Sequence, residues 1–131
     1  MPTNGRFVVD TNVVIALFAC DPAIRERIAT AAEVFIPTPV LGELYYGAIR
    51  SSRAAANIAQ IDLLPKNYAI LPVDHTTAKF FGELRNDLRK IGKPIPTNDI
   101  WVAALAAQWS ATVATRDEHF NMISNVRSEQ W

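Results

Sequence analysis

The chain has 131 residues, a length that fits one domain, and its 13 Lys and Arg balance 13 Asp and Glu to a formal net charge of zero. Hydrophobic residues make up 50% of the chain and charged residues 20%, which excludes the composition of a disordered protein. The single cysteine excludes an internal disulfide and, with only two histidines, a zinc site of four Cys and His ligands.

The sequence predicts a single domain over residues 1–131, without linkers or repeats. Asp10 and Asn12 interrupt the apolar segments near the N-terminus, so we expect neither a signal peptide nor a membrane span, and a cytoplasmic protein. The balanced charge gives no argument for nucleic-acid binding.

The first part of the chain predicts a strand and two helices. Residues 6–10 (RFVVD) are typical of a short strand, and the longer apolar segment 11–20 predicts the helix after it. Asp21 is the predicted N-cap of a second helix, with Pro22 at its first position.

Strands and helices continue to alternate along the rest of the chain. The next predicted elements are a strand at 34–36, a helix at 39–49, and a helix at 51–64 that is opened by Ser51 or Ser52 and stopped by Pro65. A strand at 68–73 follows, and then a helix that is capped by Asp74 or Thr76, runs through Lys90 and is terminated by Gly92. The last predicted elements are a helix capped by Asn98 that runs through Trp109, a strand at 111–115, a short helix at 118–123 and an extended piece at 125–130. Strands separated by helical crossovers predict the α/β class, a mainly parallel sheet covered on both faces. Ligands of such sheets bind beyond the carboxyl ends of the strands.

Three carboxylates stand alone in apolar sequence. Asp10, Glu43 and Asp99 are the only charged residues of the stretches 7–20, 34–49 and 94–115. We expect these stretches to be largely buried, and an unpaired buried charge costs several kcal/mol. Asp10 follows the first predicted strand and Asp117 follows the strand at 111–115, so both are expected at the carboxyl edge of the sheet.

Glu43 lies away from the apolar stripe of its predicted helix. On a 100° helical wheel the stripe points about 150° from Glu43, and Gly47 lies one turn further on the Glu43 face. A glycine permits close approach of another backbone, so this face is predicted to pack against something.

A divalent cation accounts for all four acids together, because Mg²⁺ takes oxygen ligands and offsets their mutual repulsion. Three of the four acids also have a simpler interpretation: Asp10 as a helix cap, Asp99 as a residue that favours the helix dipole, and Asp117 as a solvated turn residue, whereas Glu43 is the least easily dismissed. His75 and His119 are expected to be surface or turn residues, and Cys20 a small core residue.

Four segments resemble a known family. They are VVDTNVVIALF around Asp10, PVLGELYYGA around Glu43, PIPTNDIWVAALA around Asp99 and TVATRDEHF around Asp117. In order and spacing these segments resemble the acidic motifs of PIN-domain ribonucleases, and more narrowly the VapC-like toxins of toxin–antitoxin pairs. The resemblance covers nearly the whole chain.

The resemblance implies a three-layer α/β/α sandwich with a parallel five-stranded sheet, and cleavage of RNA that depends on Mg²⁺ or Mn²⁺. It assigns Asp10, Glu43, Asp99 and Asp117 to the catalytic and metal-binding cluster. Asn12 and Thr115 match polar positions that support the cluster. The resemblance further implies a homodimer and a cognate antitoxin whose tail enters the active-site groove. Attack by water would leave 5′-phosphate and 3′-hydroxyl ends.

Cations are expected around the acidic pocket, because the acids repel RNA. The candidates for contacts with the RNA backbone are Arg50, Arg53, Arg85, Arg89, Lys90, Lys93 and Arg116. For Arg85 and Arg89 the alternative is solvated ion pairing with Glu83 and Asp87 on the same helix.

Two other functions are alternatives. A haloacid-dehalogenase-like phosphatase also uses an Asp after its first strand, but it needs a second Asp two residues later, where this chain has Asn12. The other alternative is a non-catalytic α/β binding module. RNA cleavage abolished by EDTA, release of phosphate from phosphomonoesters, or binding without turnover would distinguish the three.

Overall fold

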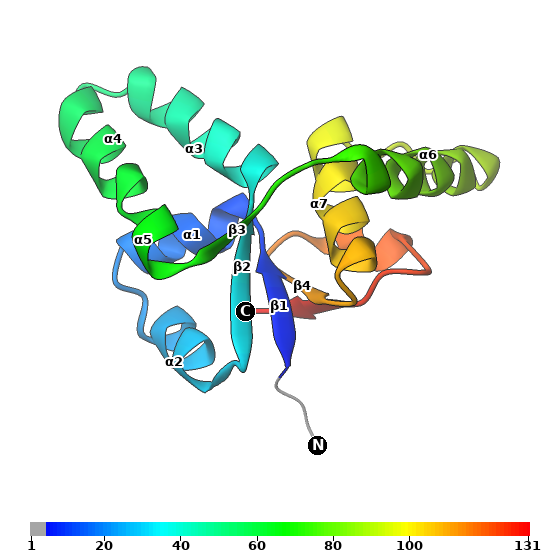
Figure 1. The fold of residues 1–131 in the computed structure, drawn as a ribbon, viewed down its shortest axis with the longest axis horizontal. Coiled ribbons are helices and arrows are strands. Elements are labelled where there is room, and N and C mark those ends of the chain that lie inside the picture. Colours follow the sequence, from blue (N-terminus) through cyan, green and yellow to red (C-terminus); the bar gives the residue numbers. More distant parts are fainter. Residues whose placement is uncertain (1–4) are drawn as a thin grey trace.

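The computed structural model describes residues 5–131 and contains a five-stranded parallel sheet (Figure 1). Its strands are β1 (Arg6–Val9), β2 (Glu33–Pro37), β3 (Ala69–Leu71), β4 (Thr112–Thr115) and β5 (Ser128–Gln130). They lie in the order β3-β2-β1-β4-β5, and all four neighbouring pairs are parallel. The predicted α/β class with a parallel five-stranded sheet is confirmed.

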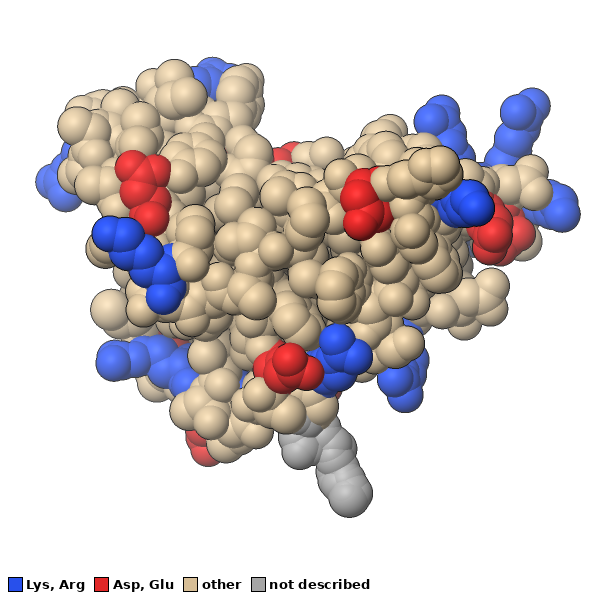
Figure 2. All heavy atoms as spheres, viewed as in Figure 1, with Lys and Arg blue, Asp and Glu red and all other residues tan. Residues whose placement is uncertain are grey.

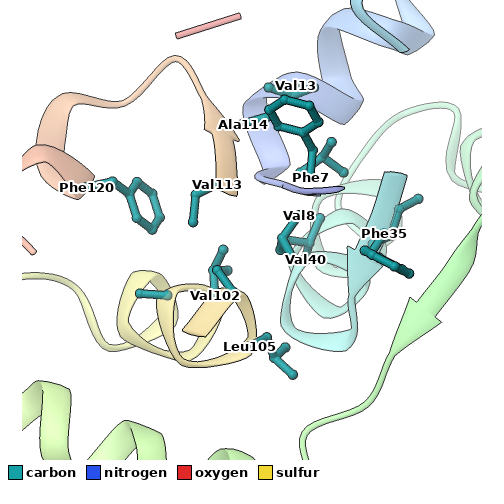
Figure 3. Packing of buried hydrophobic residues seen from close by; sticks show 14 of the residues in the cluster. Phe7, Val8, Val13, Phe35, Val40, Val102, Leu105, Val113, Ala114 and Phe120 are labelled. Atoms are coloured by element: carbon teal, nitrogen blue, oxygen red, sulfur yellow. The ribbon is translucent and has the colours of Figure 1, made fainter. Parts of the chain in front are cut away.

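Helices lie on both faces of this sheet (Figure 1). They are α1 (Thr11–Phe18), α2 (Pro22–Thr30), α3 (Thr38–Ile49), α4 (Ala54–Asp62), α5 (Leu64–Asn67), α6 (His75–Lys90), α7 (Thr97–Gln108) and the 3₁₀ helix η1 (Glu118–Met122). Val13 on α1 and Val102 on α7 pack on opposite sides of β1, where Val8 is fully buried (Figure 3). The sheet is therefore the middle layer of the predicted three-layer sandwich.

Helix α7 is the most deeply buried helix beside the sheet. Its residues 102–106 are all buried, and three of the five are alanines, so the helix axis can approach β1, β4 and α6 closely. The predicted assignment of this segment to the core is confirmed. Its N-terminal turn, which carries Asp99, is thereby fixed relative to the two central strands.

The predicted cap Asp21 is confirmed, and of the two candidates Asp74 and Thr76 the cap of α6 is Asp74. An Asp21 side-chain oxygen accepts a hydrogen bond from the backbone N–H of Ala23 at 2.9 Å, and Pro22 takes the first helical position. Asp74 accepts from the backbone of Thr77 and forms a capping box with it at the start of α6.

The predicted helix at 51–64 is wrong in its boundaries. The side chain of Ser51 accepts hydrogen bonds from the backbone of Arg53 and from Asn57, so it organises the turn before α4. Pro65 does not stop a helix but lies in the first turn of α5, where its missing N–H leaves no hydrogen bond unmade.

Cys20 was expected in the core and is exposed instead. It follows α1 with a φ of 60°, in the left-handed region, where the backbone N–H groups of Cys20 and Asp21 donate to the carbonyls of Leu17 and Ala16 and close the end of α1. Among residues 5–131, no helix has the combination of length and apolar character that crossing a membrane requires.

Candidate active site

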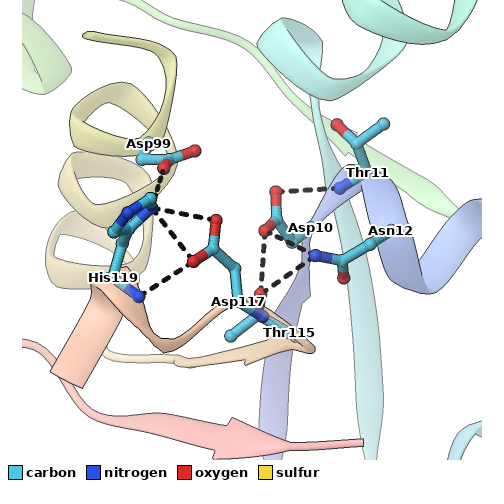
Figure 4. Close-up of polar contacts among 7 residues, drawn as sticks. All are labelled: Asp10, Thr11, Asn12, Asp99, Thr115, Asp117 and His119. Atoms are coloured by element: carbon cyan, nitrogen blue, oxygen red, sulfur yellow. Dashed lines mark hydrogen bonds and ion pairs between the residues drawn. The ribbon is translucent and has the colours of Figure 1, made fainter. Parts of the chain in front are cut away.

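The carboxyl edge of the two central strands carries two of the predicted acids. Asp10 directly follows β1, and Asp117 comes two residues after the end of β4. Because β1 and β4 are paired in parallel, both strands end at the same edge. Asp99, in the first turn of α7, faces this edge (Figure 4).

Asp10 is buried, with 6% of its surface exposed, and both of its carboxylate oxygens accept hydrogen bonds. Thr11 N–H donates to Oδ1 at 2.8 Å, and the Thr115 hydroxyl donates to Oδ2 at 2.8 Å (Figure 4). Burial raises the pKa of Asp10, and these two hydrogen bonds oppose the shift. Asp10 therefore caps α1, as one interpretation of the sequence proposed, and also belongs to the acidic cluster.

Asn12 and Thr115 join the ends of β1 and β4. The Asn12 side-chain amide donates to Asp10 at 3.4 Å and its carbonyl oxygen accepts from the backbone of Arg116 at 3.0 Å. The Thr115 hydroxyl also accepts from the backbone N–H of Asp117 at 2.9 Å. These contacts fix the backbone on either side of the acids, which is the supporting position that the resemblance implied.

Asp99 and Asp117 converge with a third side chain, His119. The donor atoms of these three residues all lie within 4.8 Å of one another. His119 Nδ1 is 3.0 Å from Asp117 Oδ1 and 3.6 Å from Asp99 Oδ2 (Figure 4). His119 is exposed, as expected, but its orientation toward two acids was not predicted.

The charges of the cluster affect one another. Burial, followed by repulsion from Asp10 and Asp117, raises the pKa of Asp99 to about 6. His119 opposes this shift, and Glu43 adds to it. The four predicted acids are thus close enough to interact electrostatically, although they do not share one compact set of donor atoms.

Glu43 is exposed, so the expectation that it lies in a buried stretch is wrong. The expected packing of its face at Gly47 is wrong as well: Gly47 is exposed, and a Cβ added there would meet no atom within 4 Å. The Glu43 carboxylate instead accepts hydrogen bonds from Asn98 and, at 3.5 Å, from the hydroxyl of Thr11. These partners are the neighbours of Asp99 and Asp10, so Glu43 lies at the rim of the acidic cluster.

Asn98 was predicted to cap α7, but the helix begins at Thr97 and has no side-chain cap. The Asn98 amide is used for the contact with Glu43. A tertiary partner on α3 thus replaces the local partner that the sequence favoured.

The donor set of Asp99, Asp117 and His119 fits a divalent cation. Carboxylate oxygens are ligands for Mg²⁺ and Mn²⁺, and an imidazole nitrogen is a common ligand of transition-metal ions. Asp10 and Glu43 add negative charge beside this set, as the raised pKa of Asp99 indicates.

Arg116 has a structural role that was not predicted. Its guanidinium donates to Asp21 at 2.8 Å and to the backbone carbonyl of Trp131 at 3.0 Å. The hydrogen bond from Arg116 lowers the pKa of Asp21. Arg116 therefore ties the loop before Asp117 to α2 and to the end of the chain, and its guanidinium is engaged there.

A basic groove lies at the end of α6. The groove has a volume of about 440 Å³, and its lining includes Arg85, Arg89, Lys93 and Thr97, two residues before Asp99. Lys and Arg gather at this end of α6 in the space-filling view (Figure 2). The guanidinium of Arg85 lies 6.0 Å from the ring of Phe81, and within the described part of the chain neither arginine forms an ion pair with Glu83 or Asp87.

Comparisons with known proteins agree with this geometry. The profile of the PIN domain family matches residues 7–125. The Haemophilus influenzae protein named "Ribonuclease VapC2" is 32% identical over 129 residues, which are 96% of this chain and 98% of that protein. The "tRNA(fMet)-specific endonuclease VapC" of Shigella flexneri is 29% identical over the same shares of the two chains, 96% and 98%.

A similar chain is found in a solved structure from Rickettsia felis. That structure is described as VapBC2 bound to a DNA fragment from the promoter of VapBC2. That chain matches with a TM-score of 0.88 and 27% identity, over 96% of this chain and 98% of that one.

The parallel sheet carries acids at its carboxyl edge, and the matching proteins are named as nucleases. This chain therefore falls in the class of nuclease-like α/β domains. The chain belongs to the PIN domain family. Within that family it is similar over nearly its whole length to proteins named ribonuclease VapC, so the resemblance inferred from the four acidic segments is confirmed. Family membership excludes the haloacid-dehalogenase-like phosphatase.

We predict that Asp99→Asn changes the pH dependence of stability. The pKa of Asp99 is raised from 3.8 to about 6, so the folded protein loses stability as the pH rises through this interval and Asp99 ionises. In EDTA the variant should gain about 1 kcal/mol relative to the parent between pH 4 and pH 7, a figure reduced for partial solvent exposure. Urea unfolding at both pH values measures the gain, and a difference that does not change with pH would contradict the electrostatic account.

Proposed function

We propose that this protein is an endoribonuclease that depends on Mg²⁺ or Mn²⁺ and acts as the toxin of a toxin–antitoxin pair. The observation that carries the proposal is the convergence of Asp10, Asp99 and Asp117 at the carboxyl edge of β1 and β4. The names of its relatives, ribonuclease and endonuclease, support the reaction class. The solved complex described as VapBC2 supports an antitoxin as the protein partner.

Each residue of the cluster has a distinct part in the proposed reaction. A divalent cation would supply a Lewis acid for the phosphate and would acidify the attacking water. Asp99 and Asp117 would hold this cation, and Asp10, fixed by Thr11 and Thr115, would be a further carboxylate ligand. Glu43 at the rim would accept the proton of a water molecule or bind a second cation. RNA ends with a 5′-phosphate and a 3′-hydroxyl are the expected products.

RNA binding next to this acidic cluster needs positive charge, which the basic groove supplies. Arg85, Arg89 and Lys93 line the groove and have no carboxylate partner in the described part of the chain, so they are free to contact phosphates. Arg116 is less suited to this role, because its guanidinium is bound to Asp21 and Trp131.

The first prediction of the proposal concerns Asp10. Asp10→Asn should lower RNA cleavage by at least about a hundredfold, because the amide keeps the cap on α1 but removes the negative charge that a hard cation needs. Cleavage of RNA in Mg²⁺ and thermal melting are measured together. Asp87→Asn, an exposed residue of α6, is the matched control and should cleave like the parent. Cleavage by Asp10→Asn at the parental rate would contradict the proposal.

The second prediction concerns Glu43, whose burial was predicted wrongly. Glu43→Gln should slow cleavage and raise the Mg²⁺ concentration needed for half-maximal activity, while melting in EDTA stays equal or rises, because repulsion of Asp10 and Asp99 is relieved. Glu26→Gln on the exposed face of α2 is the control. Unchanged activity and an unchanged Mg²⁺ requirement would remove Glu43 from the site.

The proposal also includes a homodimer. Most of the apolar surface of α7 is used in the core, but Phe80, Phe81 and Trp101 remain half-buried, and the rings of Phe81 and Trp101 stack at 3.9 Å. Sedimentation at micromolar concentrations should give twice the chain mass of 14.5 kDa. A mass that stays monomeric over this range would contradict the dimer.

A further inference from the structure

His119 is the one member of the compact donor set that is not an acid. Its ring nitrogen Nδ1 lies 3.0 Å and 3.1 Å from the two carboxylate oxygens of Asp117 and 3.6 Å from Asp99 Oδ2. The position of the ring is set locally, because the backbone N–H of His119 donates to Asp117 Oδ1 at 2.9 Å in the turn that starts η1. The imidazole is therefore held beside the two carboxylates by the same turn that positions Asp117.

The spacing of these atoms is that of ligands around one ion. An octahedral ion with ligands at 2.0–2.1 Å separates adjacent ligand atoms by about 2.9 Å. The separation of His119 Nδ1 from Asp117 is close to this value, and the longer separation from Asp99 Oδ2 requires a small rotation of one side chain.

We propose that His119 is a metal ligand that makes the site select a first-row transition-metal ion over Mg²⁺. The inference rests on the proposed metal-dependent nuclease and names the class of cation that this site takes. Mg²⁺ binds almost entirely through oxygen, whereas transition-metal ions accept imidazole nitrogen, with affinities that rise from Mn²⁺ toward Cu²⁺. A nitrogen beside two carboxylates thus strengthens binding of Mn²⁺ and its heavier neighbours and contributes little to binding of Mg²⁺.

A different role for His119 would leave the selectivity unchanged. If the imidazole only donated a hydrogen bond to Asp117 or Asp99, its loss would change the positions of the carboxylates. The binding affinity for every divalent cation would then fall to a similar degree. Direct ligation differs from this role in two observables: a nitrogen coupled to the bound ion, and an affinity loss confined to ions that accept nitrogen.

Mn²⁺ is the probe for both observables. Its unpaired electrons report directly bound nitrogen by pulsed electron paramagnetic resonance, and its binding affinity can be compared with that of Mg²⁺. The test variant is His119→Asn, which keeps a polar side chain at an exposed position. The control is His75→Asn, because His75 is the other of the two histidines and begins α6. His75 is remote from the acidic cluster. The side chains of Asp74 and Thr77 at the start of α6 are hydrogen-bonded to Gln108, and the helical rise places Gln108 about 13 Å along α7 from Asp99.

The parent and His75→Asn should both show nitrogen coupling to bound Mn²⁺, and His119→Asn should lack it. Isothermal titration should show that His119→Asn binds Mn²⁺ at least about tenfold more weakly, with Mg²⁺ affinity changed by less than about twofold. Melting in EDTA shows whether the variant remains folded, and binding of Mg²⁺ at the parental affinity is a second check on its fold.

The inference is overturned by any of the following results. Coupling that is absent from the parent, or that persists in His119→Asn, would remove His119 from the ligands. Equal losses of Mn²⁺ and Mg²⁺ affinity would assign it a hydrogen-bonding role only. A parent that binds neither ion would contradict the proposed metal dependence itself, whereas a parent that binds both through oxygen alone would contradict only the role of His119.

Discussion

Repulsion between carboxylates at the carboxyl edge of β1 and β4 is the constraint on which the site depends. Asp10 and Asp117 are brought together by the parallel pairing of the two strands, and Asp99 is brought to them by α7, whose buried alanines fix the helix beside the sheet. Burial, together with this repulsion from Asp10 and Asp117, raises the pKa of Asp99 to about 6. Packing of the core thus offsets an unfavourable charge arrangement, and a bound cation would relieve it.

Capping rules predicted the caps Asp21 and Asp74, because a cap depends on contacts within a few residues. The alternation of strands and helices predicted the parallel sheet, because a helical crossover brings the chain back to start the next strand in the same direction. Isolation of a charge in apolar sequence was a sound signal for Asp10, which is buried and fully hydrogen-bonded. The same signal misled for Glu43. Its segment buries only one face of α3, and its partners Asn98 and Thr11 come from other helices, which no local pattern reveals.

His119 and Arg116 are two further residues whose contacts the sequence did not predict. Each lies within two residues of Asp117 in a polar turn. The sequence predicted a surface or turn position for His119 and a contact with the RNA backbone for Arg116. In the folded chain His119 meets Asp99 from α7, and Arg116 meets Asp21 and the carbonyl of Trp131. The turn after β4 is therefore organised by long-range contacts, and a motif of the form Asp-x-His directly after a central strand is the sequence signal that could have indicated the ring's position.

The most direct test of the account is the metal dependence of RNA cleavage together with the chemistry of the ends produced. Purified protein is incubated with RNA in Mg²⁺, in Mn²⁺ and in EDTA, and the cleaved ends are mapped. The account predicts cleavage in either metal ion, none in EDTA, recovery when the ion is restored, and ends with 5′-phosphates and 3′-hydroxyls. Cleavage that persists in EDTA, or 2′,3′-cyclic phosphate ends, would contradict it, because the acids would then have no cation to hold and the ribose hydroxyl would be the nucleophile.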